Sequence, residues 1–382
     1  MKTKIVLLIA ILAMAGLIAC APAPAPTTAP ASSSSSSSAA SSIASSSSSA
    51  ASSVAPTTAP VATKAPAPTV APTVAAKVKL NIAYSTLNPD PLAMWVAKDA
   101  GFFDQNGLDT TVVFVDGGTK TAQALVAGDV KFAATAPSGA VAADSGGADL
   151  VLVGGFINVP NYDFLVQPSI KTAADLKGKK VAVSGLSGSS YTAARVALRD
   201  VLKLDPDKDV TYITIGTETE REAALVSKQI DATVINPDIT VKAKKDGLAV
   251  LVSLWDTNIV YQHTGIVASK AYVAANKDTV DRFFKSIVQA IGYIRDPKNK
   301  EDVIKSMSKY LKVDDRDVLE SGYARMSQKL LQCAPYGTVE GMKTIVAENK
   351  AAVDKGMTAE SMVDNSFIKA LDDNGFVKAN CK

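Results

Sequence analysis

Short apolar runs alternate with amphipathic stretches along most of the chain after residue 76. The runs that we expect to form strands are residues 78–83, 111–115, 132–135, 151–156, 181–184, 210–215, 232–235 and 250–254. Alternation of strands and helices predicts parallel sheets flanked by helices. From residue 269 onward the pattern is mostly helical, with helices expected at residues 279–295, 302–310 and 317–331.

The same strand and helix unit occurs twice, at an offset of one hundred residues. The matched positions are Thr111, Val113 and Val115 with Thr211, Ile213 and Ile215, residues 124–126 with 224–226, and Val130 and Pro137 with Ile230 and Pro237. Matched order across a strand, a helix and a second strand favours duplicated lobes over a coincidence among common residues. Because ligands bind beyond the carboxyl ends of parallel strands, the predicted site is a cleft between two such lobes.

The N-terminus carries a second hydrophobic pattern. Lys2 and Lys4 precede an apolar run at residues 5–17, which is too short to span a bilayer, since a membrane helix needs about 20 apolar residues. Residues 17–20, Leu-Ile-Ala-Cys, resemble the bacterial lipobox. That resemblance implies that residues 1–19 are a lipoprotein signal peptide and that Cys20 is lipidated. A signal peptide with an incidental cysteine is the alternative.

Residues 20–76 are built almost wholly from Ala, Pro, Ser, Thr and Val, with one charge at Lys64. Such a segment has too little large apolar surface to offset the entropy of ordering its backbone. We therefore expect a lipid-anchored, disordered linker.

Charge and cysteine content narrow the class of protein. The leader and linker hold three of the 40 basic residues and no acid, which leaves 37 basic residues against 37 acidic ones from Lys77 onward. A neutral folded part has no electrostatic footprint for nucleic acid. Cys333 and Cys381 could form a disulfide in an oxidising compartment, although the sequence does not show whether they lie close enough.

Residues 97–103, 106–108, 124–130 and 175–183 together resemble the nitrate, sulfonate and taurine-type periplasmic binding proteins, also called the NMT1/THI5-like or SsuA-like family. The resemblance implies an α/β, type II periplasmic-binding fold with two lobes around a cleft. It assigns residues 77–165 to lobe I, residues 166–257 to lobe II, and residues 258–382 to a return to lobe I with a helical C-terminal region. It also implies delivery of a captured solute to an ABC permease and its ATPase at the outer face of the cell membrane.

One loop carries the strongest local signal for binding. Residues 184–191 follow a strand and open a helix, and free N–H groups at a helix start favour an anion or a polar head group. The candidate ligand-binding residues there are Ser187, Gly188, Ser189, Ser190 and Tyr191. Helix capping by Ser187 or Ser189 is the alternative.

Further candidates lie at other strand ends. Thr135 and Ser138 in the first copy of the repeat stand where Asn236 and Asp238 stand in the second. Ser138, Asn236 and Asp238 could instead be ordinary cap or first-turn residues of helices. The remaining candidates are Ser85, Thr86, Phe156 and Asn158. The resemblance implies a sulfonate or taurine, nitrate or bicarbonate, or a thiamine-pyrimidine precursor as the ligand. No arginine falls in the predicted loops, which favours a neutral or weakly anionic organic ligand, such as a sulfonate or a thiamine-pyrimidine precursor, over nitrate. His263, the sole histidine, is expected to be structural.

Two other functions are weighed against solute binding. One branch of the wider family makes a pyrimidine and uses histidine and a cysteine-rich stretch, but this chain has one histidine and no Cys/His pair at metal-ligand spacing. We therefore expect no enzyme, no cofactor and no metal. A surface adhesin or structural lipoprotein would suit the long linker equally well. The expected partners are a small-molecule ligand, the permease and ATPase, and the membrane through the lipid anchor, with the protein itself a monomer.

Overall fold

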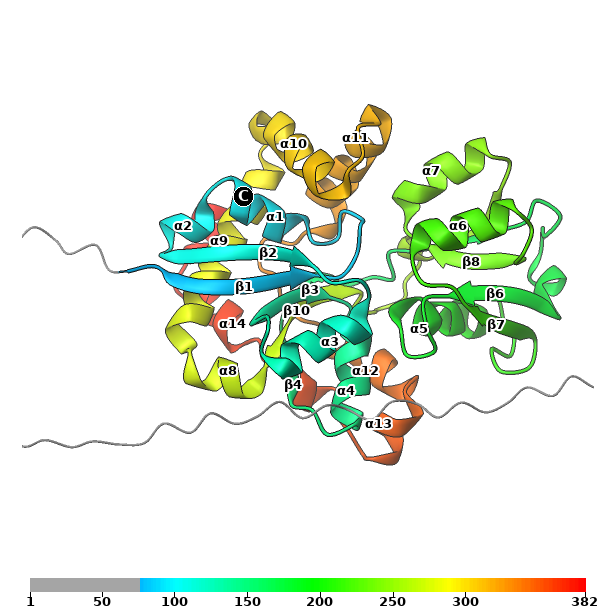
Figure 1. Ribbon diagram of the computed structural model, residues 1–382, viewed down its shortest axis with the longest axis horizontal. Coiled ribbons are helices and arrows are strands. Elements are labelled where there is room, and N and C mark those ends of the chain that lie inside the picture. Colours follow the sequence, from blue (N-terminus) through cyan, green and yellow to red (C-terminus); the bar gives the residue numbers. More distant parts are fainter. Residues whose placement is uncertain (1–75) are drawn as a thin grey trace, which may run out of the picture. The chain divides into compact units, whose positions relative to one another are not determined.

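The structure is a computed structural model that describes residues 76–382 (Figure 1). It contains two mixed five-stranded sheets flanked by helices. We call the part built on the first sheet lobe I and the part built on the second lobe II. The first sheet has the order β2 (Leu108–Phe114), β1 (Val78–Tyr84), β3 (Phe132–Thr135), β10 (Thr264–Ser269) and β4 (Leu150–Ile157). The second has the order β7 (Val210–Thr214), β6 (Lys179–Val183), β8 (Ala232–Ile235), β5 (Asp163–Val166) and β9 (Ala249–Ser253).

The two sheets have the same topology. In each, three strands run parallel and a fourth joins them antiparallel, β10 beside β3 in lobe I and β5 beside β8 in lobe II. In lobe I the antiparallel strand β10 comes after the other four strands of its sheet in the chain, whereas in lobe II the antiparallel strand β5 comes before the other four. Two crossover segments, residues 158–162 and 257–263, therefore connect the lobes.

The repeat found in the sequence coincides with this duplicated topology. Helix α3 (Gly118–Ala127) and strand β3 recur one hundred residues later as α6 (Glu218–Val226) and β8. The order of exposed and buried residues is also the same at positions 111–120 and 211–220. Proline precedes or opens the next helix in both copies, α4 (Ser138–Ser145) and α7 (Pro237–Lys245). The second copy thus repeats the first in three dimensions.

Two strands were not expected from the sequence, and one of them moves a lobe boundary. Strands β5 and β10 are short and almost wholly buried, so they show no polar alternation that would mark them. Because β5 pairs with β8 and β9, the first segment of lobe I ends before Asp163, and the expected limit at residue 165 is three residues too late.

The C-terminal third is helical and packs mainly on lobe I. Its helices are α8 (Lys270–Ala275), α9 (Lys277–Arg295), α10 (Lys300–Leu311), α11 (Arg316–Arg325) followed by a π turn (Met326–Leu330), α12 (Val339–Ala347), α13 (Lys350–Asp354), α14 (Ser366–Asp373) and α15 (Phe376–Asn380). The apolar stripe of α9 explains its place, since Phe283, Phe284 and Ile287 are fully buried in the core of lobe I. Helices α1 (Leu92–Asp99) and α2 (Phe102–Gln105) cover the same core.

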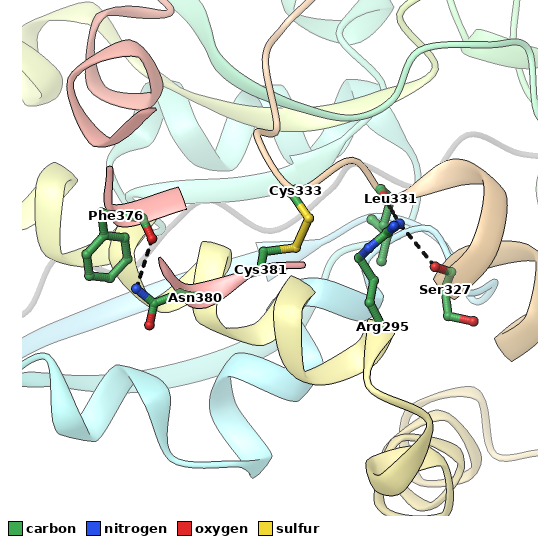
Figure 2. Close-up of a disulfide and its surroundings, with 7 residues drawn as sticks. All are labelled: Arg295, Ser327, Leu331, Cys333, Phe376, Asn380 and Cys381. Carbon is green, nitrogen blue, oxygen red and sulfur yellow. Dashed lines mark hydrogen bonds between the residues drawn. A yellow bond between two sulfur atoms is a disulfide. The ribbon is translucent and has the colours of Figure 1, made fainter. Parts of the chain in front are cut away.

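A disulfide closes the end of the chain. Cys333, just after the π turn, is bonded to Cys381, with 5.5 Å between the two Cα atoms (Figure 2). The C-terminal segment lies so close to α9 that a Cβ on Gly292 would stand 1.9 Å from the Asn380 carbonyl oxygen. Arg295 on the same helix donates to the carbonyls of Ser327 and Leu331 at 3.2 and 3.1 Å. These contacts fix the last residues of the chain against lobe I.

The predictions for residues 1–75, including the signal peptide, the lipidated Cys20 and most of the linker, lie outside the described residues. Among residues 76–382, no helix has both the length and the apolar character needed to cross a bilayer.

Candidate functional site

A cavity of about 150 Å³ lies between the two lobes, at the carboxyl ends of their parallel strands. Each of three equivalent pairs of strands contributes to it. After β1 and β6 come Ser85 and Thr86 in lobe I and the loop Ser184–Ser190 in lobe II. After β2 and β7 come residues 116–118 and 216–219, and after β3 and β8 come Ala136 and Ile239. The cavity is therefore built from the same loops of both copies of the repeat.

The loop after β6 offers hydroxyl and backbone groups to this cavity. Helix α5 (Ser189–Val196) has Gly188 at its N-cap position, and no side chain caps its first turn. Ser190 is instead engaged within the loop, since its Oγ accepts from the backbone N–H of Ser184 at 2.7 Å and lies 2.8 Å from the Ser184 Oγ. Neither Ser187 nor Ser189 caps this helix, so the predicted alternative is wrong. The first backbone N–H groups of α5 therefore have no side-chain cap, and N–H groups at a helix start can donate to an anion or a polar group.

Tyr162 connects this loop to the crossover segments. Its hydroxyl lies 2.8 Å from the Ser189 Oγ, and its ring stacks edge-on against His263 with 4.6 Å between ring centres. Burial holds the pKa of Tyr162 well above its usual value, so the side chain is a neutral phenol that can donate or accept a hydrogen bond. Tyr162 also lines the cavity.

The two lobes differ at the turn after the second strand of each sheet. Lobe I has Gly118 where lobe II has Glu218, and Thr121 where lobe II has Arg221. The close approach of α4 to this turn requires a glycine at position 139, where a Cβ would stand only 2.5 Å from the Gly118 carbonyl oxygen. At these two equivalent positions the charged side chains come from lobe II alone.

Arg221 lines the cavity but its donors are directed into the protein. Its Nε donates to Thr233 Oγ1 at 3.2 Å, and its Nη1 donates to the carbonyl of Gly216 at 2.7 Å. Its Nη2 donates to the carbonyl of Val234 at 3.4 Å and lies 3.9 Å from a Glu218 carboxylate oxygen. Arg221 thus joins the ends of β7 and β8. The predicted loops contain no arginine, as expected, but Arg221 lines the cavity from one turn into α6.

Glu218 stands at the first position of α6 with its side chain 17% exposed. Burial raises the pKa of Glu218 to about 7, against the opposing effect of Arg221. Asp116 in lobe I also lines the cavity and is exposed at its edge. The charged side chains that line the cavity are thus two carboxylates and one guanidinium.

The loop at residues 88–91 joins both crossover segments. The carboxylate of Asp90 accepts from Asn161 Nδ2 at 2.8 Å and from Thr264 Oγ1 at 3.2 Å, and lies 3.0 Å from His263 Nε2. Asp90 and His263 are both buried. The sole histidine is therefore part of the connection between the lobes and does not line the cavity.

Ion pairs join the lobes on either side of the cavity. Glu348, at the end of α12 in lobe I, pairs with both Arg195 and Arg199 of lobe II, and its side chain is 4% exposed. Asp238 of α7 pairs with Arg325 of α11. Burial raises the pKa of Asp238 to about 6. These ion pairs therefore link the two lobes on either side of the cavity.

Five of the predicted ligand-binding residues line the cavity: Ser85, Thr86, Gly188, Ser189 and Ser190. The others lie elsewhere. Ser138, Ser187 and Tyr191 line a separate groove. Thr135 is buried beside Ala136, and Asn236 caps α7 by accepting from the Asp238 amide at 3.0 Å.

Phe156 and Asn158 are also outside the cavity. Phe156 is 1% exposed within the core of lobe I, because its side chain on the edge strand β4 points into that core. Asn158 donates to the carbonyl of Tyr336 at 3.1 Å in the first crossover. Sequence reasoning missed Asp116, Tyr162, Glu218 and Arg221, although the repeat itself marked the turns after residues 115 and 215 as equivalent.

No group of three or more His, Cys, Asp or Glu side chains suited to a metal ion occurs among residues 76–382.

Residues 88–300 match the sequence pattern of the family described as NMT1/THI5 like. The chain belongs to this family. Among relatives of this NMT1/THI5-like protein, a protein of Brucella abortus named as a binding protein is 31% identical over 266 residues, which cover 66% of this chain and 79% of the relative. A protein of Brachyspira hyodysenteriae named as an ABC transporter periplasmic binding protein is 26% identical over 205 residues, covering 53% of this chain and 56% of that one.

Solved structures resemble the NMT1/THI5-like chain in fold. The alkanesulfonate-binding protein SsuA from Xanthomonas axonopodis pv. citri, bound to MOPS, superimposes with a TM-score of 0.62 at 20% identity, covering 77% of this chain and 100% of that one. The periplasmic nitrate-binding protein NrtA from Synechocystis gives a TM-score of 0.59 at 14% identity, covering 78% and 86%. The expected type II periplasmic-binding fold is confirmed.

Proposed function

We propose that this protein is the extracytoplasmic solute-binding component of an ABC importer. It captures a small organic solute in the cavity between its lobes and presents it to a permease and its ATPase. The observation that carries the proposal is the convergence of all three pairs of equivalent strand ends on one cavity between the lobes. The names of the relatives from Brucella and Brachyspira point to the same class of protein.

The site is proposed to bind without turnover. The sole histidine is buried against Asp90, away from the cavity lining. The hydroxyls of the lining loop are bonded to one another or to Tyr162, so they suit recognition of polar groups.

We also propose that cleavage before Cys20 and lipidation of that residue attach the mature protein to the outer face of the cell membrane. Two or more acyl chains hold a protein durably, whereas one chain does so only marginally. Radiolabelled palmitate supplied to expressing cells should label the parent protein but not the variant Cys20→Ser, and globomycin, which blocks the cleavage, should cause the larger precursor to accumulate. Absence of label from the parent protein would contradict the anchor.

Capture of a solute tests the binding function directly. The mature protein is incubated with the small-molecule fraction of cells that carry this chain, dialysed, and weighed by native mass spectrometry. One solute per chain should be retained. Ser189→Trp, which fills the cavity, should abolish retention because Ser189 lines it beside Tyr162.

Leu186→Trp is the matched control, since Leu186 lies on the same loop but is 63% exposed and does not line the cavity. It should retain the solute. Absence of any retained solute from the parent protein, or equal retention by Ser189→Trp, would contradict the proposed function.

A further inference from the structure

The chain contains two Asn-Gly dipeptides, Asn106-Gly107 and Asn374-Gly375, and both lie at the end of a helix of lobe I. Asn106 ends α2 with φ −90° and ψ 15°, and Asn374 ends α14 with φ −84° and ψ 2°. The two glycines have φ values of 75° and 80°, and each glycine N–H donates to the carbonyl three residues earlier, at 3.1 and 3.0 Å. The backbone geometry of the two dipeptides is therefore nearly the same.

An asparagine followed by glycine can deamidate without an enzyme, because glycine has no side chain to shield its backbone nitrogen. The glycine nitrogen attacks the asparagine Cγ, the bond from Cγ to Nδ2 breaks, and ammonia leaves with the proton of the glycine nitrogen. Water then opens the succinimide ring at either of its carbonyls, which gives aspartate or isoaspartate. The asparagine side chain must turn towards the glycine nitrogen, so contacts that hold this side chain slow the reaction.

The side chain of Asn106 is held by three acceptors. Its Nδ2 lies 2.9 Å from the carbonyl oxygen of Phe102, 3.1 Å from Ser286 Oγ and 2.7 Å from Gln289 Oε1. Ser286 and Gln289 belong to α9, which packs in the core of lobe I. Movement of the Asn106 side chain towards Gly107 would break these contacts without replacing them by water in the part-buried site.

The side chain of Asn374 is exposed and has one hydrogen bond. Its Oδ1 accepts from the backbone N–H of Phe376 at 3.0 Å, and within residues 76–382 its Nδ2 has no hydrogen-bond partner. An exposed hydrogen bond exchanges readily with water, so it restrains the side chain weakly. The two dipeptides therefore differ in the freedom of the asparagine side chain and little in the backbone.

We propose that Asn374 is a site of spontaneous deamidation and that the hydrogen bonds of Asn106 protect it from the same reaction. This modification site is independent of solute binding, since neither asparagine lines the cavity between the lobes.

The modification adds a negative charge where α14 ends, next to the exposed Asp372 and Asp373. A negative charge is unfavourable at the C-terminal end of a helix. In the isoaspartate form the main chain between α14 and α15 also gains one atom. Because α15 leads directly to Cys381, which is bonded to Cys333, the change falls on the segment that the disulfide fixes to lobe I (Figure 2).

Timed incubation of the folded protein at 37 °C and pH 8 tests the proposal. Samples are digested at mildly acidic pH, and the peptides that contain Asn374 and Asn106 are followed by mass spectrometry, with fragmentation that separates aspartate from isoaspartate. The Asn374 peptide should gain one mass unit at least about tenfold faster than the Asn106 peptide, because local opening is needed only at Asn106. In guanidinium the two rates should agree within about threefold, since the unfolded chain holds neither side chain.

The variant Gln289→Ala tests the protection of Asn106, because it removes the nearest acceptor of the Asn106 Nδ2. It should raise the rate at Asn106 at least about threefold and leave the rate at Asn374 unchanged. Gln123→Ala is the matched control, since Gln123 is exposed on α3 and should affect neither rate. Melting of each variant, followed by circular dichroism, verifies that it is folded at 37 °C.

Two results would overturn the assignment of Asn374: equal or faster modification of Asn106 in the folded parent, or an unmodified Asn374 after a period in which the unfolded chain is fully modified. An unchanged rate at Asn106 in folded Gln289→Ala would overturn the protective role of the hydrogen bonds. If Gln289→Ala is not folded, the comparison of the folded parent with the parent in guanidinium still decides the assignment.

Discussion

The carboxylate of Asp90 lies 3.0 Å from Nε2 of His263, and both side chains are buried where the chain passes between its two lobes. Asp90 belongs to the turn after β1, whereas His263 ends the second crossover segment. The first crossover is held by the same carboxylate through Asn161. One acidic residue of lobe I thus fixes both connections to lobe II.

Asp90→Ala should lower the free energy of unfolding by about 3 kcal/mol, because removing one member of a buried polar group leaves His263 and Asn161 without their partner. Urea denaturation followed by circular dichroism measures the change. The control is Asp149→Ala, whose side chain is 65% exposed and pairs with Lys270, and which should cost less than about 1 kcal/mol. Equal effects of the two substitutions would contradict a special role for Asp90.

Glu348→Gln should favour separation of the lobes, since Glu348 pairs with Arg195 and Arg199 across the interface. Small-angle X-ray scattering of the unliganded protein should give a larger radius of gyration, and the captured solute should dissociate about tenfold faster, which corresponds to about 1.4 kcal/mol. Glu340→Gln should change neither quantity. Identical scattering and dissociation for Glu348→Gln and the parent would show that the ion pairs do not hold the lobes together.

The contribution of two buried carboxyl groups to stability should fall between about pH 4 and pH 7 in the unliganded protein. Burial raises the pKa of Glu218 to about 7 and that of Asp238 to about 6. Because the folded state then binds these protons more tightly than the unfolded chain does, the two groups favour folding at low pH, and this contribution is lost as the pH rises through 6 and 7. Melting temperatures of the parent and of Glu218→Gln measure the effect.

Glu218→Gln should melt above the parent at pH 8 and close to it at pH 4, with a difference on the order of 1 to 3 kcal/mol at the higher pH. A difference that is independent of pH would contradict the raised pKa of Glu218.

Loss of the disulfide should destabilise the protein. Cys333 and Cys381 are 48 residues apart, and a closed loop of that size is expected to contribute about 4 kcal/mol through the entropy of the unfolded chain. The double variant Cys333→Ser/Cys381→Ser should unfold at lower guanidinium concentration than the oxidised parent. A reducing agent should lower the guanidinium midpoint of the parent toward that of the variant and leave the midpoint of the variant unchanged. An unchanged midpoint for the parent under reducing conditions would contradict the stabilising role of the disulfide.

The duplicated fold could be predicted from the sequence because α3 and α6, and β3 and β8, recur at a constant offset with matched apolar positions. Strands β5 and β10 could not, because a short strand buried on both faces lacks the alternation that identifies it. The antiparallel pairing of β5 with β8 is what moves the lobe boundary.

The site was predictable where the loop itself carried the signal, as in Gly188, Ser189 and Ser190. Arg221 and Glu218 were missed because their importance comes from the direction of side chains on α6, which the sequence does not give. Phe156 was misplaced because a residue near a strand end can point into the core or into the cleft, and one residue of register decides which.

The central claim is that the space between the lobes encloses the transported solute. A crystal structure of the mature protein with its captured solute tests it most directly. The account predicts one solute molecule between Thr86 of lobe I and Ser189 of lobe II. A solute bound outside this cavity, or a cavity filled by protein side chains in the complex, would contradict it.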